Sequence, residues 1–185
     1  MKVFKTGTTA LYPLPVVLVT CGLERPNIIT LAWAGTLCSK PPMVGIGVRP
    51  ERYSHGLIIQ GGEFVVNLPS ADQVAIVDYC GHVSGRDTDK WGACGLTPVP
   101  SSQVRVPLIA ECPVALECRV AQRVPLGSHD LFIGEVVAVV ANEEMLDERK
   151  RLDFGRANLL AYAAEGYYQL GKHLGSYGDW RQGAR

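Results

Sequence analysis

Short apolar runs, rich in valine and isoleucine and separated by glycine and proline, constrain the fold of this chain more than any other feature. The runs cover residues 16–21, 28–34, 44–48, 64–68, 114–120 and 131–141. Each has the length of a strand, and strands bounded by turn residues are typical of a sheet protein. In 114–120 the apolar residues alternate with Glu117 and Arg119, which predicts a half-buried strand. The uninterrupted run 131–141 predicts a strand buried on both faces.

Helical patterns are fewer. Ser70 is a plausible N-cap for a helix that ends at Gly81. A short helix is expected over 52–60 and a third helix over 153–165. Successive strands outnumber these helices and do not alternate with them one for one. The order of elements therefore favours a mainly β fold, an antiparallel barrel with a few added helices, over a parallel doubly wound sheet.

Charge and length limit the classes of protein. The 185 residues include 18 Lys plus Arg and 18 Asp plus Glu, so the formal net charge is zero. A nucleic-acid binder usually carries a basic excess, so no nucleic-acid partner is expected. The length suits one domain over 1–185. No apolar signal core follows the first residues and no run is long enough to span a bilayer, which favours a cytoplasmic protein without a membrane partner.

Two familiar site motifs are incomplete. Gly45 and Gly47 begin a G-x-G pattern, but Pro50 stands where a dinucleotide-binding motif has its third glycine and prevents the helix that such a site needs. The four histidines are dispersed, with Cys80 and His82 as the one close Cys/His pair, so no metal site is expected. The six cysteines show no C-x-x-C pair and are interpreted as reduced thiols packed as small hydrophobes.

The stretch 27–69 is the most informative part of the chain. It predicts a strand, a polar loop over 36–40, a second strand, a basic turn over 49–54 that opens a helix, and a third strand. Between 36 and 60 the chain carries Lys40, Arg49 and Arg52 against Glu51 alone, a local excess of 3 − 1 = +2. Hydroxyls, guanidiniums and a helix N-terminus together suit a phosphate or another anion, although a solvated loop and a capped helix would use the same residue types.

Four further segments complete a family resemblance. They are Tyr79-Cys-Gly-His-Val-Ser-Gly-Arg-Asp-Thr-Asp-Lys-Trp91, Gly95-Leu-Thr-Pro98, Gly127-Ser-His-Asp-Leu-Phe-Ile-Gly-Glu-Val136 and Tyr167-Tyr-Gln-Leu-Gly171. Together with 27–69, and in this order, they resemble the flavin reductase-like, FMN-binding split-barrel family, which includes flavoredoxin. The resemblance runs from about residue 13 to residue 178. It implies a Greek-key split β-barrel, a homodimer, and one FMN per subunit near the interface.

The resemblance also implies where the cofactor binds. The flavin would lie against 27–34, with its phosphate held by 36–40 and 49–54. Within those segments Ser39, Arg52 and Ser54 are also the side chains that the anion pattern indicates. The candidate cofactor-binding residues are Asn27, Thr30, Ala32, Trp33, Ala34, Thr36, Cys38, Ser39, Lys40, Arg49, Arg52, Ser54 and His55.

Some of these residues have simpler explanations. Asn27 and Thr30 would pair with the edge of the isoalloxazine, but Thr30 also suits a strand as a β-branched residue. Trp33 would stack on a flavin or nicotinamide, or would pack in the core or at a dimer contact. Cys38 is either a neighbour of the flavin or a small buried thiol.

His129 is the candidate catalytic residue. In similar proteins it lies near the docking site of the reduced nicotinamide, where it would hydrogen-bond to the nicotinamide or tune protons at the flavin. A plain turn histidine is the alternative. The polar stretch 84–90 is either a mobile lid over the flavin or an ion network of Arg86, Asp87, Asp89 and Lys90.

The family resemblance leaves three functions open. The first is an FMN oxidoreductase that takes electrons from NADH or NADPH and delivers them to free flavin, a partner protein or a small acceptor. The second is an electron-transfer flavoprotein that holds FMN without binding a nicotinamide. The third is a split-barrel module that binds another cofactor or a metal complex. A flavin supplies the redox chemistry itself, which explains why the sequence shows no catalytic triad or carboxylate pair.

Overall fold

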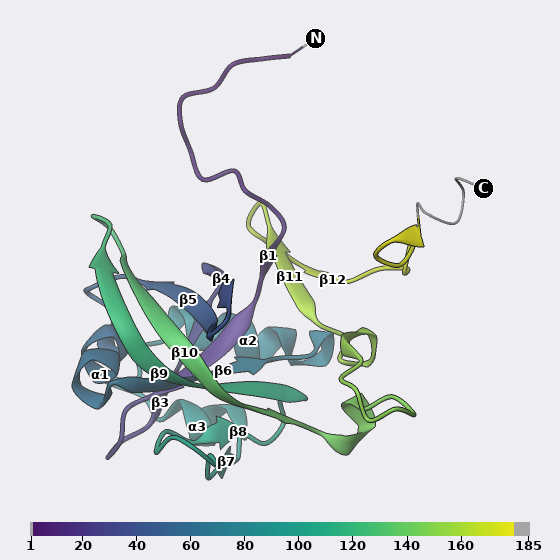
Figure 1. The fold of residues 1–185 in the computed structure, drawn as a ribbon. Helices are drawn as coiled ribbons and strands as arrows, with labels where there is room; N and C mark the ends of the chain where they lie inside the picture. The colour runs from purple at the N-terminus through teal and green to yellow at the C-terminus, as the bar shows by residue number, and fades with distance from the viewer. Residues whose placement is uncertain (1, 180–185) are drawn as a thin grey trace.

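The computed structural model describes residues 2–179. Its main element is a curled seven-stranded antiparallel sheet with the strand order β3-β2-β6-β9-β10-β5-β4 (Figure 1). The strands are β2 (Val17–Cys21), β3 (Asn27–Leu31), β4 (Ala34–Ser39), β5 (Pro42–Val48), β6 (Glu63–Leu68), β9 (Val114–Pro125) and β10 (Asp130–Ala141). The mainly β, split-barrel prediction is therefore confirmed.

Three helices, two smaller sheets and short 3-10 turns accompany the seven-stranded sheet. The helices are α1 (Tyr53–Gly61), α2 (Val74–His82) and α3 (Lys90–Cys94), and 3-10 turns lie at Ala71–Gln73, Glu143–Met145 and Phe154–Arg156. Strands β7 (Pro98–Val99) and β8 (Leu108–Ile109) pair with each other. Strand β1 (Leu14–Pro15) forms a separate sheet with the hairpin of β11 (Leu160–Ala163) and β12 (Gly166–Gln169), and the N-terminal residues extend away from this sheet (Figure 1).

Two hydrophobic clusters hold the site elements in place. One fills the interior of the curled sheet, where Ile46, Phe64 and Phe132 are buried. The other packs Val77 and Cys80 of α2 against Leu18 and Ile28 on the sheet. Burial raises the pKa of the Cys80 thiol to about 12, which keeps it protonated and suits a packing role. Because the helices share these cores with β2 and β3, residues distant in sequence meet at one end of the barrel.

The predicted helix over 153–165 is wrong. Only a 3-10 turn forms there, and the rest is the β11–β12 hairpin, whose turn residues Ala164 and Glu165 both have positive φ. Strand β11 pairs with β1 on one side and with β12 on the other. Tyr162 packs against Tyr167 with ring centroids 5.9 Å apart. Long-range strand pairing therefore overrides the helical spacing.

Two strand predictions and one loop prediction need correction. The run 28–34 is split, because β3 ends at Leu31 and β4 begins at Ala34. The predicted loop 36–40 is mostly strand β4, with its hairpin turn at residues 40–41. The run 131–141 is not buried on both faces. Strand β5 pairs only with 130–135 of β10, so the second half of that strand has β9 as its single neighbour and is partly exposed.

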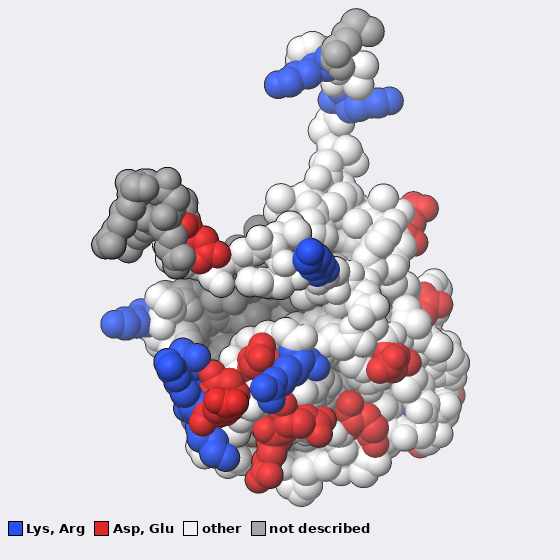
Figure 2. Space-filling model, turned by 90° about the vertical axis from the view of Figure 1, so that its right-hand side faces the viewer, with Lys and Arg blue, Asp and Glu red and all other residues white. Residues whose placement is uncertain are grey.

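On the face shown in Figure 2, acidic and basic side chains intermingle. This distribution agrees with a formal net charge of zero. None of the helices within residues 2–179 is long and apolar enough to cross a membrane. Within the same residues, no three His, Cys, Asp or Glu side chains come together as a group that could hold a metal ion.

Candidate functional site

Three adjoining cavities run from β3 and the start of α1, past the turn of the β9–β10 hairpin, to β4, β5 and the N-terminal segment. The polar cavity, of about 150 Å³, is lined by Asn27, Ile29, Glu51, Arg52, Tyr53, Ser54, Cys80, Gly81, Val83, Ser84, Gly85 and Lys90. The middle cavity, of about 110 Å³, shares Ile29, Arg52 and Gly81 with it. The apolar cavity, of about 880 Å³, shares Gly47 and His129 with the middle one. The series therefore changes from a cationic end to an apolar end.

The first turn of α1 builds one wall of the polar cavity. Arg52 is the N-cap residue but its side chain makes no capping hydrogen bond, so the guanidinium is available to another partner. Ser54 is buried in the same turn, and its hydroxyl accepts a hydrogen bond from the Asn27 amide at 2.8 Å. The free N–H groups and the dipole at a helix N-terminus favour an anion at this position.

Lys90 supplies the second cation of the polar cavity. Only 3% of this residue is exposed, and its ammonium donates to the carbonyl oxygens of Ile28 at 2.7 Å and Cys80 at 2.8 Å. Desolvation lowers the pKa of Lys90 from its ordinary value. An ammonium has three donors, so these two hydrogen bonds leave one for a ligand in the cavity. The sequence interpretation did not include Lys90 in the site, although Asp89 before it is a recognisable N-cap signal for α3.

The segment 84–90 lines the polar cavity through Ser84, Gly85 and Lys90, and its charged residues do not form the suggested ion network. Gly85 lies so close to Asn27 that a Cβ atom at this position would overlap the amide. Arg86 lies over the Tyr53 ring, 5.9 Å from its centroid, and Asp89 caps α3 by accepting from two backbone N–H groups. Within residues 2–179, the ion pairs found do not include Asp87, Asp89 or Lys90.

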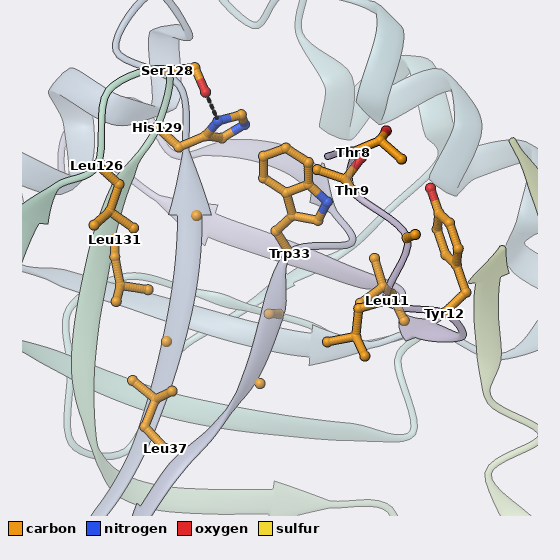
Figure 3. A pocket seen from close by; sticks show the side chains of 16 residues that line it. Thr8, Thr9, Leu11, Tyr12, Trp33, Leu37, Leu126, Ser128, His129 and Leu131 are labelled. Carbon is orange, nitrogen blue, oxygen red and sulfur yellow. Dashed lines mark hydrogen bonds between the residues drawn. The ribbon is translucent and has the colours of Figure 1, made fainter. Parts of the chain in front are cut away.

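His129 and Trp33 form the border between the middle and apolar cavities. Their ring centroids are 4.1 Å apart with the planes tilted by 48°, and Ser128 Oγ lies 2.9 Å from His129 Nδ1 (Figure 3). Trp33 is 41% exposed, with the N-terminal residues Thr8 and Thr9 on its other side (Figure 3). Trp33 is therefore neither a core residue nor a free surface residue but a wall of the site.

The surroundings of His129 lower the pKa of its imidazole. Desolvation is the largest effect that lowers its pKa, the Arg49 cation adds to it, and Glu51 opposes it. The imidazole therefore remains unprotonated to lower pH than an ordinary histidine. A neutral imidazole can both donate and accept one hydrogen bond, and here Ser128 occupies one of the two ring nitrogens.

Several of the predicted site residues meet in these cavities. Asn27, Arg52 and Ser54 line the polar cavity, and Thr30 and Arg49 line the middle one with His129. Trp33 and Ala34 line the apolar one. Thr30, however, uses its hydroxyl to donate to the Val77 carbonyl of α2, which supports a structural role for that group.

Other predicted residues lie elsewhere. Ala32 lies between β3 and β4, and Thr36, Cys38, Ser39 and Lys40 lie along β4 and its turn; none of the five lines any of the three cavities described above. In the register with β5, Ser39 pairs with Pro42 whereas Ala34 pairs with Ile46. Five strand residues span about 17 Å. Within one chain, the structure therefore does not bring Ser39 and Lys40 to the phosphate site expected at Arg52 and Ser54. His55 also points away from the cavities, because its ring pairs with Asp130.

Comparison with known proteins supports the same assignment of the fold. Residues 9–171 match the flavin reductase like domain. The chain is 38% identical over 78% of its length to an uncharacterised protein of Archaeoglobus fulgidus, of which the match covers 81%. It superimposes on the flavoredoxin of Desulfovibrio vulgaris with a TM-score of 0.90 and 34% identity, covering 96% of this chain and 98% of that one. For the flavoredoxin of Methanosarcina acetivorans the TM-score is 0.89, the identity 28% and the coverage 100% of both chains.

The chain therefore belongs to the flavin reductase-like family. Membership of this family identifies it as a flavin-related oxidoreductase or electron carrier.

Proposed function

We propose that the protein binds FMN across the three cavities and reduces it with NADH or NADPH. The change from a cationic end to an apolar end carries this proposal, because FMN has a phosphate at one end and a flat aromatic ring at the other. Arg52, Lys90 and the N-terminus of α1 would hold the phosphate. Asn27, Ser54 and Ser84 add neutral hydrogen-bonding groups around it.

The residues present fit this cofactor. The Arg52 guanidinium makes no cap bond and the Lys90 ammonium keeps one donor, so the polar cavity presents two cations to a ligand. At the other end, the side chains of Trp33, Leu37, Leu126 and Leu131 offer a wide apolar wall (Figure 3). When bound, FMN supplies the redox chemistry by accepting a hydride and passing on one or two electrons.

The protein's own contribution would be binding, orientation and exclusion of water. His129 would act on the nicotinamide side as a neutral hydrogen-bonding group, since its lowered pKa keeps a ring nitrogen unprotonated. Trp33 would hold that imidazole through ring contact and present its exposed surface to a flat ligand. Arg49, which lines the middle cavity and is half exposed, is placed to meet a phosphate of the nicotinamide dinucleotide.

A second copy of the chain is part of this proposal. Leu37 and Leu126 on the rim of the apolar cavity are 51% and 64% exposed, and Leu11 on the N-terminal segment is 82% exposed. Such a cluster of exposed apolar side chains favours burial against a protein partner. A homodimer through this face would also cover the open side of the cavity.

The second candidate is an electron carrier that holds FMN and exchanges electrons with a redox partner protein. The similarity to two flavoredoxins, with TM-scores of 0.90 and 0.89, favours this alternative. The purified protein distinguishes the two candidates when FMN is added and the excess removed. We expect a yellow protein that NADH or NADPH bleaches in the absence of oxygen. A colourless protein would refute both functions, whereas a yellow protein that neither nucleotide bleaches would refute only the reductase.

A further inference from the structure

A buried contact between an imidazole and a carboxylate links the start of α1 to the residue that follows His129. His55 Nε2 lies 2.8 Å from Asp130 Oδ2, and the two side chains are only 10% and 9% exposed. His55 belongs to the first turn of α1 and follows Ser54, which lines the polar cavity. Asp130 is the first residue of β10 and follows His129, which lines the other two cavities.

The surroundings of the pair restrict both side chains. The His55 ring contacts the edge of the Phe132 ring at a centroid distance of 5.2 Å and an angle of 71°. Arg123 on β9 places its Nε 3.7 Å from the same Asp130 oxygen that faces His55. Asp130 therefore faces one cation from β9 and one imidazole from α1.

Stability alone is a weak reason to bury such a pair. The cost of taking the charges out of water generally offsets much of their attraction, and apolar replacements are often neutral or stabilising. The position of the pair points instead to the site. His55 and Asp130 are the sequence neighbours of Ser54 and His129, so their contact sets the distance between the anion-binding turn and the histidine.

We propose that His55 and Asp130 are positioning residues that hold His129 against Trp33, in register with the start of α1. The α1 side is the rigid side, because Ile58 and Ser54 are buried. The hairpin turn is the less firmly held side, because residues 126–128 lie outside the β9–β10 pairing and Leu126 is 64% exposed. Loss of the pair would therefore displace His129 and leave Arg52 and Ser54 in place.

The role of the pair in electron transfer rests on the proposed function, but its effect on His129 can be measured without a cofactor. A protonated imidazole in contact with an indole quenches the indole fluorescence, so the Trp33 emission of the FMN-free protein reports the His129 contact as the pH falls. The His129→Gln variant lacks the pH-dependent emission that His129 causes, so the difference from the wild type identifies this part of the tryptophan signal. The same readout remains available if the wild-type protein proves unable to bind FMN.

The test compares Asp130→Ala with Asp130→Asn, because asparagine keeps an oxygen that can accept from His55. In Asp130→Ala we expect the pH-dependent part of the Trp33 emission to disappear. Reduction by NADH should slow by roughly tenfold to a hundredfold, as for a misplaced site group, while the Kd for FMN changes less than about threefold. Asp130→Asn should keep both properties close to the wild-type values.

His55→Phe provides a second variant in case Asp130→Ala does not fold, since it keeps an aromatic ring beside Phe132 but cannot pair with Asp130. We expect it to behave like Asp130→Ala. Asp147→Ala removes an ion pair with Arg151 outside the cavities and should change neither readout. A folded Asp130→Ala or His55→Phe protein that retains the pH-dependent Trp33 emission would overturn the proposal. If the wild-type protein binds FMN, variants whose bound FMN is reduced by NADH at the wild-type rate would also overturn the proposal.

Discussion

Replacement of Arg52 by alanine tests the cationic end of the site most directly. Arg52 is exposed, lines both the polar and the middle cavity, and makes no capping hydrogen bond with its side chain. Its removal should therefore change the free energy of unfolding by no more than about 0.5 kcal/mol, as for most surface substitutions. If the guanidinium binds the phosphate of FMN, the effect should fall on binding.

The expected size follows from the type of contact. A hydrogen bond to a charged group contributes about 1.5–3 kcal/mol. Since about 1.4 kcal/mol corresponds to a factor of ten, FMN should bind about 10- to 150-fold more weakly to Arg52→Ala. Riboflavin has the same ring and ribityl chain but no phosphate. The Kd for riboflavin should change by less than about twofold. The ratio of the riboflavin Kd to the FMN Kd should therefore fall by nearly the same factor by which FMN binding weakens.

The assay is a titration of the flavin-free protein with each flavin, followed by flavin fluorescence. Arg149→Ala is the matched control, because Arg149 is an exposed arginine that lines none of the three cavities. It should bind both flavins like the wild type. Equal weakening of FMN and riboflavin would show that Arg52 acts on the ring or on the fold. An unchanged Kd for FMN would place the phosphate elsewhere.

Two further predictions concern the histidine contact and the core. Because desolvation and then Arg49 lower the pKa of His129, Trp33 emission should titrate below the ordinary histidine value of 6.5, and Arg49→Ala should raise the midpoint. The unfolded chain takes up this proton first, so the His129 contribution to stability should be lost as the pH falls through the lowered pKa. Gly134→Ala should lower the free energy of unfolding in urea by about 1–3 kcal/mol through overpacking, because its Cβ would meet the Phe64 ring at 2.5 Å. Gly56→Ala in α1, where no atom outside the adjoining residues and helix backbone lies within 4 Å of the new Cβ, should instead raise the free energy of unfolding by about 0.5–1 kcal/mol.

The apolar patterns predicted the sheet because strand formation here follows local sequence. Val17–Cys21 and Glu63–Leu68 form buried strands where the runs indicated them, and α1 begins one residue after the predicted start. The segment 153–165 failed for a non-local reason. Its strand pairs with β1, about 150 residues earlier, and nothing in its own spacing indicates that edge.

The sequence predicted the candidate site where the site residues lie close together in the chain or belong to the same structural element. Arg52 and Ser54 belong to a recognisable basic turn before a helix, and the structure places both in the polar cavity. The hairpin turn that carries His129 was also indicated, but its contact with Trp33 joins two connecting segments that are distant in sequence. His55 was one of the candidate cofactor-binding residues, yet in a helix the residue after Ser54 points in another direction, and here its ring meets Asp130.

The cations of the site show what each level of structure decided. The sequence alone determined that the chain is neutral overall and that Lys40, Arg49 and Arg52 form a local positive excess. The tertiary structure then separated Lys40, because β4 and β5 run antiparallel and carry their turn away from the start of α1. It placed Lys90 in the polar cavity instead, because α2 and α3 pack on the face of β2 and β3. Which cationic side chains lie close together in a sheet protein depends on strand direction and on the packing of distant segments. Neither can be read from the composition of the sequence.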